Sequence, residues 1–166
     1  MNSFKLYLVR KFTSLIPETR AFGLKRILYR WAGADIGDGV RINSSTRISG
    51  IGNLTIGPNT WIGPGTHIAC SYEINIGANC DIAPCVYIGD GTHEITPNRE
   101  RIAGIETTRK VTIGDGCWLG VNSTILPGLT IGKKCVIAAG AVVTKDFGDM
   151  KLLGGVPAKI IKDFNI

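Results

Sequence analysis

The stretch VTIGDGCWLGVNSTILPGLTIGKKCVIAAGAVVTKD, residues 111–146, places an aliphatic residue at every sixth position. The same spacing recurs upstream, giving five groups of three aliphatic anchors. The anchors are Ile36, Ile42 and Ile48; Ile56, Ile62 and Ile68; Ile76, Ile82 and Ile88; Ile113, Leu119 and Ile125; and Ile131, Ile137 and Val143. Small residues, most often Gly, follow most anchors, as a chain that turns after a very short strand requires. The spacing predicts about five triangular coils of a parallel β-helix.

An α-helical interpretation of the repeats is excluded, because apolar residues do not recur at three and four and each Gly would cost about 1 kcal/mol in a helix interior. The spacing does not fix the hand of the coil, although parallel crossovers are usually right-handed. The fifth place of each hexad is mostly small or β-branched, which predicts a second inward-pointing position. Cys80, Cys117 and Cys135 occupy it. We therefore interpret these cysteines as core packing rather than as metal ligands.

The 166 residues predict a single folded domain in three parts. Residues 1–35 form basic amphipathic helices, residues 36–147 form the β-helix with a loop inserted at about 91–110, and residues 148–166 form a C-terminal tail. The five cysteines are an odd number and no secretory signal opens the chain. Both features predict a cytoplasmic protein.

The net charge of +6 originates in the segment before the repeats, where basic and apolar residues interleave. The basic residues are Lys5, Arg10, Lys11, Arg20, Lys25, Arg26 and Arg30. Pro17 separates a first helix from a second, roughly residues 18–32. Two compatible interpretations stay open: the helices cap the open end of the β-helix, and residues 1–32 contact the inner face of an anionic membrane. Nucleic-acid binding is disfavoured, because no recognised binding motif is present.

The six-residue spacing is lost once, between Ile88 and Ile113, where the chain reads GDGTHEITPNRERIAGIETTRKVT. This insertion is rich in charge, and loops that project from a rigid scaffold often carry function. Its first turn contains His93, which we interpret as a candidate for acid–base chemistry. The second histidine, His67, lies in an uninterrupted coil and is interpreted as structural.

Four ordered motifs resemble the hexapeptide-repeat acetyltransferases of the galactoside, maltose and nodulation-factor type. They are GDGTHEI at 89–95, VTIGDGCWLGVNSTILPGLTIG at 111–132, AAGAVVTKD at 138–146 and GGVPAKIIK at 154–162. The basic leader ending in RWAGADIG makes the whole chain similar to polysaccharide and capsule O-acetyltransferases related to the colanic acid enzymes. The resemblance implies a left-handed parallel β-helix with an N-terminal helical cap. It also implies a homotrimer that binds acetyl-CoA between subunits and needs no metal.

The resemblance assigns roles residue by residue. His93 matches the general base that takes a proton from the acceptor hydroxyl. Trp118 matches a tryptophan near the pantetheine arm. Small residues that let this arm approach the backbone are Gly120, Ala138 and Gly140. Residues that match partners of the CoA phosphates are Thr144, Lys145, Lys159 and Lys162.

The chain departs from the sugar acetyltransferases where their acceptor binds. It reads Ile62-Gly63-Pro64-Gly65 where those enzymes carry an asparagine in an A-N-F-D stretch, and basic helices replace their N-terminal acceptor-binding segment. We therefore expect a sugar hydroxyl in a cell-surface polysaccharide or its precursor rather than a small free sugar. Candidate acceptor contacts are Asp81, Asp90, Glu94, Arg99 and Arg101.

Three other functions compete with this interpretation. An amino-sugar N-acetyltransferase would also need a base, so His93 does not exclude it. A carbonic anhydrase built on the same β-helix needs three histidines for its zinc, whereas this chain has two. A trimeric scaffold without catalytic activity would not need His93 or the T-K-D and P-A-K elements. Acetyl transfer to oxygen is the function that the sequence favours.

Overall fold

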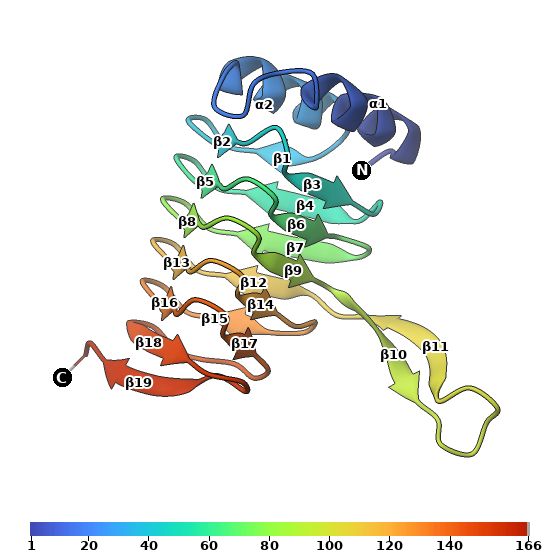
Figure 1. The fold of residues 1–166 in the computed structure, drawn as a ribbon, viewed down its shortest axis with the longest axis vertical. Helices are drawn as coiled ribbons and strands as arrows, with labels where there is room; N and C mark the ends of the chain where they lie inside the picture. Colours follow the sequence, from blue (N-terminus) through green and yellow to red (C-terminus); the bar gives the residue numbers. More distant parts are fainter. Residues whose placement is uncertain (166) are drawn as a thin grey trace.

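A computed structural model describes residues 1–165 as a stack of short strands with two helices at its N-terminal end (Figure 1). The strands form three faces of a triangular prism. Face A comprises β1 (Asp35–Ile36), β4 (Asn53–Ile56), β7 (Glu73–Ile76), β12 (Val111–Ile113) and β15 (Thr130–Ile131). Face B comprises β2 (Arg41–Ile42), β5 (Trp61–Ile62), β8 (Asp81–Ile82), β13 (Trp118–Leu119), β16 (Val136–Ile137), β18 (Lys151–Gly154) and β19 (Lys159–Asp163). Face C comprises β3 (Arg47–Ser49), β6 (His67–Ala69), β9 (Tyr87–Gly89), β14 (Thr124–Ile125) and β17 (Val142–Val143).

The aliphatic anchors lie one above another inside the prism. On each face the anchor of one coil pairs in parallel register with the anchor of the next. All fifteen are at most 2% exposed. Because burying a side chain of this size stabilises a fold by roughly 1.5–3 kcal/mol, the columns are the main source of stability. The predicted parallel β-helix of hexapeptide repeats is confirmed.

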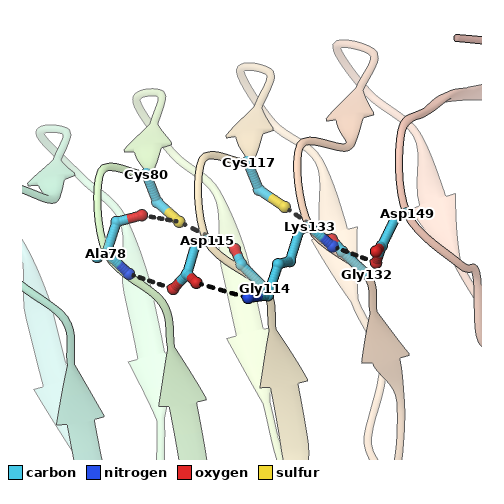
Figure 2. Close-up of polar contacts among 8 residues, drawn as sticks. All are labelled: Ala78, Cys80, Gly114, Asp115, Cys117, Gly132, Lys133 and Asp149. Atoms are coloured by element: carbon cyan, nitrogen blue, oxygen red, sulfur yellow. Dashed lines mark hydrogen bonds and ion pairs between the residues drawn. The ribbon is translucent and has the colours of Figure 1, made fainter.

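The corner between faces A and B repeats its polar contacts from coil to coil (Figure 2). Cys80 Sγ donates to the Gly114 carbonyl at 3.2 Å, and the thiol of Cys117 makes the same bond one coil later at 3.0 Å. Asp115 Oδ1 accepts from the Ala78 backbone N–H at 2.9 Å. Both cysteines are buried. The core-packing interpretation of these cysteines is confirmed, and their thiols also satisfy corner carbonyls.

A sixth, incomplete coil follows the five that the spacing predicts. Phe147 pairs with Ile131 and Leu153 pairs with Ile137, and all four side chains are buried. Phe147 and Leu153 keep the six-residue spacing, but Phe147 comes only four residues after Val143. The chain then reverses, and β19 pairs antiparallel with β18. This reversal covers the last parallel edge of face B, which would otherwise be open to another chain.

Two helices, α1 (Ser3–Thr13) and α2 (Phe22–Trp31), cover the opposite end, as the N-terminal pattern predicts (Figure 1). Tyr29 packs into the core at 1% exposed. Lys25 is also buried, its Nζ donates to the Glu18 carbonyl at 2.8 Å, and burial lowers the pKa of its amine. Within residues 1–165, neither helix has the length and apolar character needed to cross a membrane.

The insertion between β9 and β12 is an antiparallel hairpin of β10 (Gly91–Ile95) and β11 (Ala103–Thr108) that projects from the prism (Figure 1). It leaves at the corner between faces C and A. Asp90 is fully buried at its base and accepts from the backbone N–H groups of Ser71 and Tyr72, both at 2.8 Å. The hairpin is therefore held by a carboxylate that belongs to the scaffold.

The anchor columns predict a large difference between buried and exposed isoleucines. Ile82→Ala, at a fully buried anchor, should lower the free energy of unfolding by about 2–5 kcal/mol, because a cavity replaces packed methyl groups. Ile105→Ala, at a hairpin residue that is 64% exposed, is the control and should change it by about 0.5 kcal/mol or less. Urea unfolding followed by circular dichroism measures both, and equal losses would contradict the stacking account.

Candidate functional site

His93 is the third residue of β10 and is held from the opposite strand of the hairpin. Its ring atom Nδ1 lies 3.0 Å from the Gly104 carbonyl oxygen. A carbonyl oxygen can only accept, so Nδ1 carries the proton in this bond. The neutral ring therefore has its lone pair on Nε2. This is the arrangement that a general base requires.

Glu106 lies directly across the hairpin from His93, because the two residues are partners in the antiparallel register. Both side chains line a cavity of about 200 Å³. Tyr87, which points outward from β9, and Ser71 line the same cavity. The hairpin register thus places a carboxylate and an imidazole at the lining of one cavity.

A second cavity, of about 460 Å³, also includes His93 in its lining. The predicted acceptor contact Glu94 and the predicted CoA contact Thr144 line it. The remaining lining residues are Thr92, Ile95, Thr107, Arg109, Leu126 and Pro127. His93 is thus shared by two cavities, each large enough for part of a small substrate.

Most of the predicted CoA contacts lie away from His93 within one chain. Trp118 projects from β13 on face B and is 55% exposed, and Lys159 and Lys162 lie on β19 of the same face. The corner between faces B and C holds Gly120, Ala138 and Gly140. Lys145 follows Thr144 at the corner between faces C and A, with Nζ 5.6 Å from the centroid of the Phe147 ring. The predicted CoA residues therefore lie in three places: on face B, at the corner between faces B and C, and at the corner between faces C and A.

Two of the predicted small residues are small for different reasons. A Cβ added to Gly120 would lie 2.7 Å from both Ala139 N and Ile137 O, so the next coil requires glycine there. Gly140 has a φ of +68°, but an added Cβ would meet nothing within 4 Å. The surface at Gly140 is consequently open to a ligand, whereas Gly120 serves the stacking of the coils.

The five candidate acceptor contacts are dispersed. Asp81 lies on face B in register with Trp118. Arg99 and Arg101 line a cavity of about 420 Å³ toward the tip of the hairpin. The Asp90 carboxylate is buried at the hairpin base. Within residues 1–165 of one chain, only Glu94 among the five shares a cavity with His93.

Sequence reasoning missed Glu106 and Tyr87. The sequence predicts a loop at about 91–110, and a loop supplies no cross-strand partner for His93. Two alternating stretches, Gly91–Ile95 and Ala103–Thr108, flank a turn rich in polar residues, and they were the available signal for a hairpin. Tyr87 could have been found as the outward position of the last strand before the insertion.

Comparison with known proteins gives one family and several relatives. A family model described as the hexapeptide repeat of succinyl-transferase matches residues 110–145. The putative lipopolysaccharide biosynthesis O-acetyl transferase WbbJ of Escherichia coli (strain K12) is 33% identical over 128 residues, which cover 77% of this chain and 59% of WbbJ. Galactoside O-acetyltransferase of the same strain is 44% identical over 55 residues, covering 33% of this chain and 27% of that protein.

The solved structures agree with the sequence comparison in fold. A galactoside acetyltransferase in complex with coenzyme A superposes with a TM-score of 0.75 at 22% identity, over 98% of this chain and 80% of that chain. The chain spans between 27% and 59% of the length of the curated relatives reported above. Taken together, the matches confirm the resemblance to hexapeptide-repeat acetyltransferases that the four motifs indicate.

The bond between His93 and Gly104 predicts which ring nitrogen is protonated. At a pH where the imidazole is neutral, long-range proton–nitrogen correlation spectra should show His93 with the proton on Nδ1 and Nε2 unprotonated, because the Gly104 carbonyl can only accept. His67 in the same sample provides the reference for a second imidazole. A proton on Nε2 of His93 would contradict its readiness to act as a base.

Proposed function

We propose, from the chain's resemblance to the hexapeptide-repeat acetyltransferases, that it transfers an acetyl group from acetyl-CoA to a hydroxyl of a sugar, with His93 as general base. One observation carries the proposal: the Nδ1 bond to Gly104 leaves Nε2 available on a residue that lines two cavities. One cavity would receive the acceptor and the other the thioester.

The chemistry requires no covalent enzyme intermediate. His93 Nε2 takes the proton from the acceptor hydroxyl while that oxygen attacks the carbonyl carbon of the thioester. The resulting tetrahedral oxyanion collapses, the carbon–sulfur bond breaks, and the departing CoA thiolate takes the proton from the imidazolium. Glu106, opposite His93 in register, stabilises the imidazolium between these two steps. The products are an acetyl ester and free CoA.

Acetyl-CoA is assigned to a surface that two copies of the chain share. Trp118 would lie beside the pantetheine arm, with Lys159 and Lys162 near the phosphates, and these residues belong to face B. His93 belongs to the corner between faces C and A. A second copy that presents its face B to this corner would bring both groups together, and repetition of one such heterologous contact closes a homotrimer.

The acceptor is assigned to the sugars of cell-surface polysaccharides or their precursors. The relative WbbJ, whose name refers to lipopolysaccharide biosynthesis and O-acetyl transfer, supports this assignment. An amino-sugar N-acetyltransferase is the alternative. Incubation with labelled acetyl-CoA and matched sugars that differ only in a hydroxyl or an amine at one carbon separates the two, since only one product would be an alkali-labile ester.

The protein is assigned to the cytoplasm, with residues 1–32 in contact with the inner face of the membrane. All five cysteines lie in the described residues and are free thiols, which suits a reducing compartment.

The helical cap also exposes large apolar side chains between its basic residues. They are Phe4, Tyr7, Leu8, Phe12, Leu15, Leu24, Ile27 and Trp31. A basic surface with exposed apolar groups is suited to an anionic lipid interface.

Removal of the base should act on turnover alone. His93→Ala should lower kcat by about 10² or more, as expected for loss of a general base, while leaving the dissociation constant for CoA unchanged. Steady-state kinetics with labelled acetyl-CoA measures the first quantity and calorimetry the second. Added imidazole should restore part of the activity, because it can enter the vacated cavity and accept the proton.

The control for this variant is Asp35→Ala, an exposed position on β1, which β4 and β7 separate from β12, where the hairpin rejoins face A. It should keep the activity of the unmodified protein. Near-normal turnover by His93→Ala would remove the assigned role of the imidazole. Loss of CoA binding in that variant would instead show that His93 holds the cofactor.

A further inference from the structure

A cavity of about 340 Å³ lies between helix α1 and the first coil. Arg10 and Lys11 enter it from the helix, and Arg47 enters it from β3. The other lining residues are Tyr7, Ser14, Ser44, Ser45 and Thr46. No carboxylate contributes to this lining, so the cavity is cationic and surrounded by hydroxyl groups.

The three cations have no ion-pair partner within residues 1–165, where four other basic residues do. Glu18 is beside this cavity, since its Oε2 accepts from the backbone N–H of the lining residue Ser45 at 3.2 Å. Three cations therefore face a single nearby carboxylate. Like charges held together repel one another, and a bound anion with several oxygens would relieve this repulsion.

The surrounding charge has the same sign. Residues 1–34 contain seven Lys or Arg and one Glu, whereas the rest of the chain contains twelve basic and twelve acidic residues. The net charge of +6 is thus located in the cap and not in the prism. Burial, and then the charges of Arg47 and Arg10, lower the pKa of His67, the next side chain along face C. The positive potential therefore reaches beyond the cavity itself.

Face C connects this cavity to the catalytic histidine. Arg47, His67 and Tyr87 are successive register partners on β3, β6 and β9. Neighbouring strands are about 4.8 Å apart, so Arg47 and Tyr87 are separated by about 10 Å. His67 packs edge-on against Tyr87 with ring centroids 5.5 Å apart, and Tyr87 lines the cavity that contains His93. This row of side chains along face C ends at the Tyr87 ring, against which a sugar ring could pack.

We propose that the cavity formed by Arg10, Lys11 and Arg47 binds the phosphate or diphosphate group of the acceptor, whose sugar lies along face C toward His93. The substrate class is then a glycosyl phosphate or glycosyl diphosphate, not a free sugar. This assignment rests on the acetyl transfer proposed above. Arginine suits the role because its planar guanidinium binds two phosphate oxygens at once.

Two sources can supply such a group: a nucleoside diphosphate sugar and a lipid diphosphate sugar. The helix surface beside the cavity favours the lipid. Leu8 lies three residues before Lys11 on α1, and Leu15 lies two residues past the end of the helix; they are 40% and 83% exposed. A lipid chain that leaves the diphosphate would meet these side chains, whereas a nucleoside would not use them.

The first experiment measures anion binding without acetyl transfer. Inorganic pyrophosphate is titrated into the full chain in the absence of acetyl-CoA. Arg47→Ala should weaken its binding about tenfold or more, as expected when a charged hydrogen-bond partner is removed. Lys11→Ala, at an exposed helix position, gives a second variant that should fold normally. Arg41→Ala is the matched control, because Arg41 is exposed at the equivalent position of β2 on face B.

The second experiment measures acetyl transfer to a sugar supplied free, as a nucleoside diphosphate and as a polyprenyl diphosphate. Arg47→Ala should raise KM about tenfold for the phosphorylated acceptor with kcat unchanged, while Arg41→Ala should change neither. Preference for the polyprenyl form identifies the lipid source, and preference for the nucleotide form identifies the soluble one. Either preference supports the site.

Two results would overturn the assignment: equal use of the free and phosphorylated sugar, or equal behaviour of Arg47→Ala and Arg41→Ala. The two proposals fail in different ways. Transfer to a free sugar that is insensitive to Arg47 would retain the acetyltransferase and remove the phosphate site. Pyrophosphate binding that requires Arg47, without transfer to any acceptor, would retain the anion site and remove the proposed function.

Discussion

Every other feature of this protein depends on the columns of aliphatic side chains that recur at every sixth residue. A strand of two or three residues cannot be stable by itself, so each coil exists only because its anchors pack on those of its neighbours. The stacking of successive coils also limits which residues fit at the corners. A Cβ at Gly50 would lie 2.0 Å from the Cys70 carbonyl oxygen, because the coils approach too closely there for a side chain. Sequence can therefore vary freely only where it faces outward or leaves the prism.

The hairpin is the place where the chain leaves the prism, and the columns continue without it. β12 pairs with β7 in register although the insertion separates their coils in sequence. The buried Asp90 carboxylate fixes the point of departure, and the antiparallel register then sets His93 opposite Glu106. The site thus takes its geometry from a rigid scaffold and its side chains from the hairpin that interrupts the repeat. The cationic cavity at the N-terminal end borders face C through Arg47 of β3, and β9 of the same face leads into this hairpin.

The sequence predicts the anchors, the cap and the position of the insertion, because each follows from spacing or charge that can be counted. It does not predict the sixth coil, since Phe147 follows Val143 after four residues instead of six and the six-residue spacing is broken there. His93 is recognisable because it is one of two histidines and lies in the segment that interrupts the repeat. Glu106 cannot be identified from the spacing, because its relevance depends on the hairpin register. The burial of the Asp90 carboxylate at a corner leaves no sign in the spacing either.

The central claim is that His93 of one copy acts on acetyl-CoA held by face B of another. It is tested most directly by mixing two inactive variants, His93→Ala and a chain carrying Trp118→Ala, Lys159→Ala and Lys162→Ala, and refolding them together. If the site is shared, equal random mixing in a trimer with heterologous contacts should restore about a quarter of the normal activity, since one interface in four combines two intact halves. Mixed assemblies with no activity above that of either variant would contradict the account.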